Sequence, residues 1–227
     1  MIRSVFITGT DTGIGKTTCS AALLVALRRS SLRAIGMKPV ASGCRQTACG
    51  LRNDDAELLL AHSETGIDYA LVNPYAFAAP IAPSIAAADA DIVIDVDILR
   101  TAFATLSRRS DVIVVEGVGG WAAPLSATLM QANLVRELRL PVILVVGLRL
   151  GCINHAVLSA RAIVADGCEL LGWIANTIDP QMLRIEENLA TLKRLLPAPC
   201  LGLLPTQNPV DPIALASELD DAVRALA

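Results

Sequence analysis

The sequence has 227 residues, a length that suits one large domain or a tight pair of smaller ones. Hydrophobic residues make up 53% of it and charged residues 18%, which allows a full buried core and excludes a disordered chain. The formal net charge is −3, no basic cluster stands out and no apolar stretch reaches the roughly 18 residues of a membrane span, so we expect no nucleic acid and no membrane as partners.

Short apolar runs rich in Val, Ile and Leu alternate along the chain with segments that have a helical pattern. The first run follows Met1–Ser4 directly, which leaves no room for a signal peptide, and we expect a cytoplasmic protein. The predicted strands are Val5–Ile7, Ala34–Met37, Val112–Val115, Val142–Gly147, Leu171–Ala175 and Cys200–Leu204. The predicted helices are Thr18–Ser30, Asp54–Ala61, Ile94–Ser107, Met130–Leu138, Ile153–Ala165, Arg184–Leu195 and Ile213–Leu226.

This order of elements predicts an α/β fold with a doubly wound, mainly parallel sheet flanked by helices. We expect one domain over residues 1–227, in which Tyr69–Ser84, with three prolines, is an ordered but irregular excursion. Ligands of such folds bind beyond the carboxyl ends of the strands. Residues that directly follow a predicted strand are therefore the candidates for function.

The first strand leads into a glycine-rich loop, Thr8–Thr17, that ends in Gly-Lys-Thr before a helix. Glycines let backbone N–H groups approach a polyphosphate, Lys16 adds a positive charge, and the Thr17 hydroxyl can ligate Mg²⁺. The P-loop pattern needs a glycine where this chain has Thr10, and Gly9 comes one residue too early. A glycine-rich turn that only caps an ordinary α/β unit is the alternative.

Lys38 follows the second strand, and Pro39 keeps it out of helical geometry. A lysine at this place can stabilise a transferring phosphoryl group or a substrate anion. A solvated surface lysine is the alternative. Further on, Asn53 or Asp54 would cap the next helix, whereas Asp55 would supply a carboxylate for Mg²⁺, and spacing alone favours the cap.

Glu116 ends the third strand, where P-loop enzymes place a carboxylate that acts on Mg²⁺, and the glycines after it let backbone approach a ligand. The fourth strand leads into the turn 149–155, which offers free N–H groups at a helix start. The fifth strand ends at Asn176, whose side-chain amide can form hydrogen bonds with a purine base. The six cysteines and two histidines lack the spacing of a zinc site, and we expect reduced thiols, mostly buried.

Taken in order, the phosphate loop, 38–43, 116–121 and 150–156 resemble the dethiobiotin synthetases, and the resemblance runs from Phe6 through Pro205. The early glycine belongs to that family's own loop, Gly-Thr-Asp-Thr-x-x-Gly-Lys-Thr. The resemblance implies an ATP- and Mg²⁺-dependent cyclo-ligase. It would join CO₂ to 7,8-diaminononanoate through a carbamate and a carbamic-phosphoric mixed anhydride.

The resemblance also implies roles for residues. Lys16 and Lys38 would be catalytic, Ser42 would contact the diamine, and Mg²⁺ would be held by Thr17, Asp55 and Glu116, so Asp55 is expected to do more than cap a helix. The site would lie at a homodimer interface, where the partner subunit would present the substrate-tail turn Gly151, Cys152, Ile153 and Asn154. The nucleotide would contact Thr12, Gly13, Ile14, Gly15, Lys16, Thr17, Thr18, Asp55, Glu116, Gly117, Val118, Gly119, Asn176, Thr177, Pro205, Thr206 and Gln207.

Two positions depart from the family. Gly13 stands where other members can carry an acidic residue, and Asn188 stands where close relatives would place a tyrosine. After Pro205 the sequence diverges, so Asp211 is only one candidate for a nucleotide contact from the C-terminal loop. An ATP-driven partitioning protein would share the loop and the dimer but would not explain 38–43, and an amidotransferase-type ligase would need a nucleophilic cysteine with a setting that none of the six has.

Overall fold

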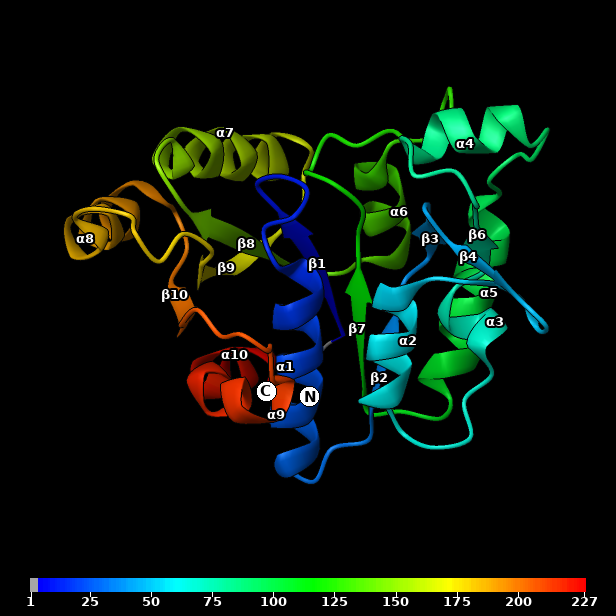
Figure 1. The fold of residues 1–227 in the computed structure, drawn as a ribbon, viewed down its shortest axis with the longest axis horizontal. Helices are drawn as coiled ribbons and strands as arrows, with labels where there is room; N and C mark the ends of the chain where they lie inside the picture. Colours follow the sequence, from blue (N-terminus) through cyan, green and yellow to red (C-terminus); the bar gives the residue numbers. More distant parts are fainter. Residues whose placement is uncertain (1–3) are drawn as a thin grey trace.

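Burial on both faces favours parallel pairing of the strands, and β1, β2, β7 and β8 are buried along their whole length. In the computed structural model, which describes residues 4–227, six parallel strands pair in the order β10-β9-β8-β1-β7-β2 (Figure 1). Met1–Arg3, expected to lead directly into the first strand, lie outside the described residues. The strands are β1 (Val5–Gly9), β2 (Ala34–Met37), β7 (Val112–Glu116), β8 (Val142–Leu148), β9 (Leu170–Thr177) and β10 (Cys200–Leu204).

The register of the sheet brings three strand ends together. Ile7 of β1 lies opposite Glu116 of β7 on one side and Ile143 of β8 on the other. Met37, the last residue of β2, lies opposite Val115. The exit of β1 therefore lies beside the end of β7 and the middle of β8, and the residue after β2 falls beside Glu116. This confirms the predicted doubly wound α/β fold.

Helices cover both faces of the sheet. One face packs against α1, α2 and the C-terminal helices, and the other packs against α5, α6, α7 and α8. None of the helices described within residues 4–227 is long and apolar enough to cross a membrane. The longer helices are α1 (Lys16–Arg29), α2 (Asp54–Ala61), α5 (Val96–Ser107), α6 (Gln131–Leu138), α7 (Cys152–Ala165) and α8 (Ile185–Leu195).

The C-terminal segment corrects one prediction. Instead of a single helix over Ile213–Leu226, the chain forms α9 (Pro212–Leu215), a 3₁₀ turn (Ala216–Leu219) and α10 (Asp220–Leu226). The 3₁₀ turn buries Ala216 and Leu219, and it brings the Glu218 carbonyl so close to Gly202 that a Cβ there would lie at 2.6 Å. Close packing against β10 therefore breaks the regular helix.

The segment between β2 and α5 also holds more structure than the sequence predicts. The expected irregular excursion contains α3 (Tyr69–Val72), β6 (Tyr75–Ala76) and the start of α4 (Pro83–Asp89). Strand β6 pairs in parallel with β3 (Val40–Ala41), while β4 (Arg45–Thr47) and β5 (Gly50–Arg52) form a separate antiparallel pair. Strands of two or three residues are too short to carry a periodic pattern, which is why the sequence did not predict them.

Candidate phosphate-binding and acid–lysine site

The loop between β1 and α1 has the backbone conformation that its glycines allow. Gly13 and Gly15 have φ angles of 72° and 85°, in the left-handed region that favours glycine. Gly15 stands at the N-cap of α1, so no side chain occupies the N–H groups at the helix start. A Cβ on Gly15 would lie 2.1 Å from Asn176 Nδ2. The helix start is thus open to an anion from solvent.

Lys16 begins α1 and is almost fully buried. Its Nζ donates to the Asp11 carbonyl at 2.8 Å, so the side chain folds back along the loop. Burial, followed by the positive charge of Lys38, lowers the pKa of Lys16 from its usual 10.5 to about 8. A bound polyphosphate would supply the negative charge that this buried cation lacks.

Lys38 lies at the centre of the site, 4% exposed, so the alternative of a solvated surface lysine is wrong. Its Nζ donates to Glu116 Oε1 at 2.6 Å, to Asp55 Oδ2 at 3.0 Å and to the Gly117 carbonyl at 3.2 Å. Burial alone would lower its pKa, but the charges of Glu116 and Asp55 outweigh burial and raise it. These three contacts and the raised pKa favour the charged form of Lys38 and fix its position.

The Asp55 carboxylate is held in its charged form by the same contact. Burial alone would raise its pKa, but the charge of Lys38 and the hydrogen bond that Lys38 donates to Oδ2 lower it. Asn53 positions Asp55: its side chain accepts from the Ala56 N–H at 3.2 Å and caps α2. The cap and the carboxylate, which the sequence left as alternatives, belong to different residues: Asn53 caps α2, and Asp55 pairs with Lys38.

Glu116 carries a carboxylate oxygen without a partner. Its side chain is fully buried, and Oε1 receives hydrogen bonds from Lys38 and, at 2.8 Å, from Thr17 Oγ1. Within residues 4–227, Oε2 is the one buried side-chain oxygen or nitrogen that has no hydrogen-bond partner. Leaving it so costs free energy, which a cation would offset.

The residues around this orphaned oxygen fit Mg²⁺. No group of three or more His, Cys, Asp and Glu within residues 4–227 forms an all-protein metal site. Mg²⁺, however, keeps several waters and takes only one or two carboxylates together with substrate phosphates. Glu116 and Asp55 are two such carboxylates, and Thr17 donates its proton to Glu116, which leaves its oxygen lone pairs free.

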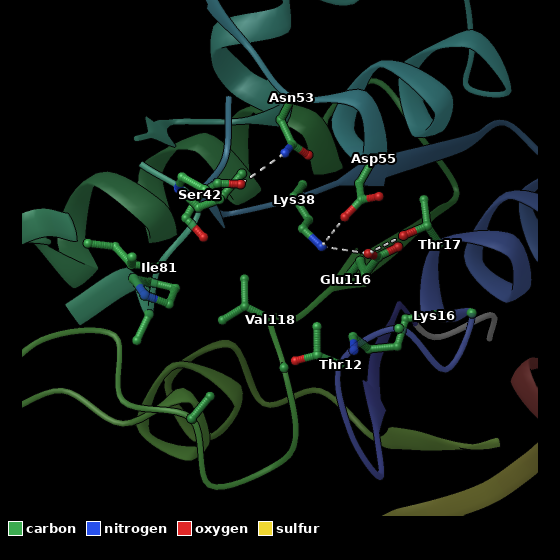
Figure 2. A pocket seen from close by; sticks show the side chains of 18 of the residues that line it. Thr12, Lys16, Thr17, Lys38, Ser42, Asn53, Asp55, Ile81, Glu116 and Val118 are labelled. Atoms are coloured by element: carbon green, nitrogen blue, oxygen red, sulfur yellow. Dashed lines mark hydrogen bonds and ion pairs between the residues drawn. The ribbon is translucent and has the colours of Figure 1, made fainter. Parts of the chain in front are cut away.

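These groups line one cavity of about 870 Å³ (Figure 2). Lys16, Lys38 and the two carboxylates converge at one end, while Ser42 and Ile81 line the side away from the loop. From the predicted set, the cavity is lined by Thr12, Gly13, Gly15, Lys16, Thr17, Thr18, Lys38, Ser42, Asp55, Glu116, Val118 and Gly119. Sequence reasoning did not identify Pro80, Ile81, Ala82, Pro83, Ala123 and Pro124, because apolar loop residues carry no chemical signal.

The remaining predicted residues do not line this cavity. Asn176 Nδ2 donates to the Ile14 carbonyl at 2.9 Å, which ties the end of β9 to the back of the phosphate loop. Thr206 Oγ1 donates to the Thr177 carbonyl at 2.6 Å, so the loop after β10 lies beside the end of β9. Gly151 is the N-cap of α7, with φ 95°. The roles expected for these residues and for Gly151, Cys152, Ile153 and Asn154 remain predictions.

Two polar side chains near the site, Gln131 and Arg149, were missed. Gln131, almost fully buried, accepts from the Val118 N–H at 2.8 Å and donates to the Gly120 carbonyl at 3.2 Å, which fixes the glycine turn after Glu116. Arg149 Nη2 lies 2.6 Å from Asp11 Oδ2. Opposite charges at the ends of two strands were a readable signal for this pair, but only once β1 and β8 are known to be neighbours.

The chain is similar to known proteins over most of its length. A family model described as an AAA domain matches residues 3–214. A Xanthomonas euvesicatoria pv. vesicatoria protein named ATP-dependent dethiobiotin synthetase BioD is 59% identical over 214 residues, 94% of this chain and 96% of the relative. A Xylella fastidiosa (strain 9a5c) protein of the same name is 56% identical over 219 residues, 96% of this chain and 97% of the relative.

Solved structures resemble the chain in fold. The MinC:MinD cell division protein complex of Aquifex aeolicus contains a chain that aligns with a TM-score of 0.61 at 17% identity, covering 99% of this chain and 95% of that one. The ParA family ATPase of Chlorobium tepidum TLS aligns with a TM-score of 0.58 at 12% identity, covering 97% and 98%. At such identities the likeness concerns the arrangement of strands and helices alone.

Proposed function

The chain belongs to the ATP-dependent dethiobiotin synthetases, and from that premise we propose that it joins CO₂ to 7,8-diaminononanoate, giving dethiobiotin, ADP and phosphate. It is an ATP-dependent cyclo-ligase of biotin synthesis. The observation that best supports the proposed reaction is the buried Lys38, which meets Glu116 at 2.6 Å beside the phosphate loop. In the proposed reaction, this cation would lie where the carbamate and the triphosphate are brought together.

The proposed reaction has three steps. One amine of the diamine attacks CO₂ and loses a proton, forming a carbamate. A carbamate oxygen then attacks the γ-phosphorus of ATP, and the bond from that phosphorus to the β-phosphate oxygen breaks. ADP departs, and the product is a carbamic-phosphoric mixed anhydride. The second amine attacks the carbonyl carbon and expels phosphate, which closes the cyclic urea.

Lys16 and Lys38 would stabilise different anions. We infer that Lys16 exchanges its hydrogen bond with the Asp11 carbonyl for the phosphates of ATP, next to the open start of α1. Lys38 would hold the carbamate against the triphosphate and stabilise the charge that develops on transfer. Its raised pKa supports this role, because a lysine that lost its proton would no longer attract either anion.

We propose that Thr17, Asp55 and Glu116 hold Mg²⁺, with Glu116 Oε2 as the oxygen that now lacks a partner. When bound, Mg²⁺ would neutralise charge on the phosphates. Lys38 lies between these two carboxylates and holds both in place before the nucleotide arrives.

The rest of the predicted site completes the proposal. Ser42 would contact the diamine, and Asn176, with Thr177 and 205–207, would contact the adenine. Asn188 and Gly13 would alter the family's carboxylate and nucleotide contacts. A homodimer would let the turn Gly151, Cys152, Ile153 and Asn154 of the partner subunit receive the tail carboxylate. We further propose one domain over residues 1–227 and a cytoplasmic location, which use of ATP supports.

The decisive experiment follows label from bicarbonate into product. The protein is incubated with Mg·ATP, the diamine and ¹³C-bicarbonate, and the cyclic urea is sought by mass spectrometry. We expect ATP turnover to require both the diamine and bicarbonate. ATP hydrolysis that ignores the diamine, with no labelled urea, would overturn the proposal.

Two variants then test the lysine assignment. Lys38→Ala should abolish turnover while largely sparing ATP binding, whereas Lys193→Ala, which removes an exposed lysine of α8, should leave both unchanged. Full turnover in Lys38→Ala would remove this residue from the mechanism.

A further inference from the structure

Asp11 is a junction of three contacts at the start of the phosphate loop. Its Oδ1 accepts from the Thr12 N–H at 2.7 Å, its Oδ2 lies 2.6 Å from Arg149 Nη2, and its carbonyl accepts from Lys16 Nζ at 2.8 Å. The Thr12 N–H, and then Arg149, lower the pKa of the Asp11 carboxyl, so it stays charged. One residue thus connects the loop backbone, the loop lysine and a distant arginine.

Arg149 comes from a different part of the fold. It follows β8 directly, and its carbonyl accepts from the Cys152 N–H at 3.0 Å, which closes the turn that begins α7. The Thr10 N–H also bonds to β8, at the Val145 carbonyl, 3.0 Å away. The arginine side chain therefore extends from a rigid turn to a loop that is already anchored on the same strand.

The ion pair between Arg149 and Asp11 contributes little to folding stability, but it lies next to the phosphate loop. The side chains of Arg149 and Asp11 are 41% and 47% exposed, and half-exposed ion pairs contribute little to folding. Neither residue lines the cavity, but Thr12 and Lys16 do, and both are bonded to Asp11. A bare Asp11 carboxylate would also repel a polyphosphate in the adjacent loop.

We propose that Arg149 is a positioning residue for the phosphate loop, which it holds through Asp11 in the conformation that receives the nucleotide. The inference rests on the proposed nucleotide site and adds a residue to it. Arg149 neutralises the Asp11 carboxylate and fixes its direction. Asp11 in turn fixes the Thr12 N–H and offers its carbonyl as the resting partner of Lys16 Nζ.

The test is a double-mutant cycle read by nucleotide binding. Arg149→Gln, Asp11→Asn and the double variant are titrated with Mg·ADP by calorimetry, without diamine or bicarbonate. The amide in Asp11→Asn keeps an oxygen for the Thr12 N–H, so this change breaks the ion pair and spares the turn. We expect each single variant to raise the Kd about tenfold and the double variant to raise it no further, because both act through one contact.

Two further variants separate positioning from general stability. Arg149→Lys keeps the charge and should restore most of the affinity. Arg33→Gln breaks a pair with Asp111 that has the same 2.6 Å contact but lies at the amino ends of β2 and β7, away from the site. It should leave the Kd unchanged, and all the variants should keep the melting temperature of the natural chain.

Three results would overturn the inference. One is an unchanged Kd in Arg149→Gln. Another is tighter binding in Asp11→Asn with weaker binding in Arg149→Gln, which would make the arginine a direct phosphate ligand. The third is an equal loss in Arg33→Gln. Formation of the urea without the expected Kd pattern would overturn this inference alone, and the Kd pattern without urea would overturn the proposed reaction alone.

Discussion

Replacing Lys16 by methionine should make the nucleotide-free protein more stable. Lowering of the Lys16 pKa from 10.5 to about 8 means that the folded chain disfavours the charged form, which the unfolded chain carries freely. At about 1.4 kcal/mol per pH unit, the difference amounts to about 3 kcal/mol at pH 7. Loss of the hydrogen bond to the Asp11 carbonyl costs about 1 kcal/mol, so we expect a net gain of about 2 kcal/mol.

The pH dependence identifies the cause. Below pH 8 Lys16 is charged in both the folded and the unfolded chain, and the penalty is complete. Between pH 8 and 10.5 the folded chain releases the proton first, so the natural protein regains stability and the advantage of Lys16→Met disappears. The gain should therefore be large at pH 7 and close to zero near pH 10.

The assay is urea unfolding of both proteins at pH 7 and at pH 10, without nucleotide and at one protein concentration. Lys193→Met, a change at an exposed lysine of α8, serves as the control and should alter stability by less than about 0.5 kcal/mol. Lower stability of Lys16→Met at pH 7, or a gain that persists unchanged at pH 10, would refute the reasoning.

Three other results are expected. Lys38→Met should lower the free energy of unfolding by about 3–5 kcal/mol, because it leaves Glu116 buried and uncompensated, and urea unfolding should show recovery when Glu116→Gln is added. Gly15→Ala should abolish nucleotide binding in calorimetry, since its Cβ has no room, whereas Gly13→Ala, with nothing within 4 Å of the added atom, should cost only about 1 kcal/mol for its positive φ. Near pH 8, ADP binding should take up about half a proton as Lys16 becomes charged, which titrations in two buffers of different ionisation enthalpy detect; no uptake would contradict the lowered pKa.

Much of the site was predictable because each residue follows a strand whose sequence is distinctive. Glu116 ends a run of four apolar residues, and Lys38 follows a buried strand and precedes a proline, so both positions could be assigned to the carboxyl edge of the sheet. Helix α2 was predicted with its observed bounds because two cap candidates, Asn53 and Asp54, mark its start, and the structure identifies Asn53 as the cap.

The rest depended on contacts between distant segments. Sequence spacing does not specify that β8 lies beside β1, so the pair of Arg149 and Asp11 was out of reach. The apolar wall at Pro80–Pro83 was equally hidden, because loop residues carry neither period nor charge. Local signals predict single elements, whereas the order of strands decides which elements meet.

Gly13 and Gly15 of the phosphate loop differ in how well they tolerate substitution. Gly15 is confined by Asn176, because a Cβ at position 15 would lie 2.1 Å from Asn176 Nδ2, so a side chain there requires Asn176 to move or to become smaller. Gly13 lines the cavity, and a Cβ added there would meet nothing within 4 Å. A replacement therefore needs only to adopt a positive φ, as asparagine and aspartate do more readily than other residues. Position 13 is therefore where natural drift or directed evolution can add a nucleotide contact without repacking the loop.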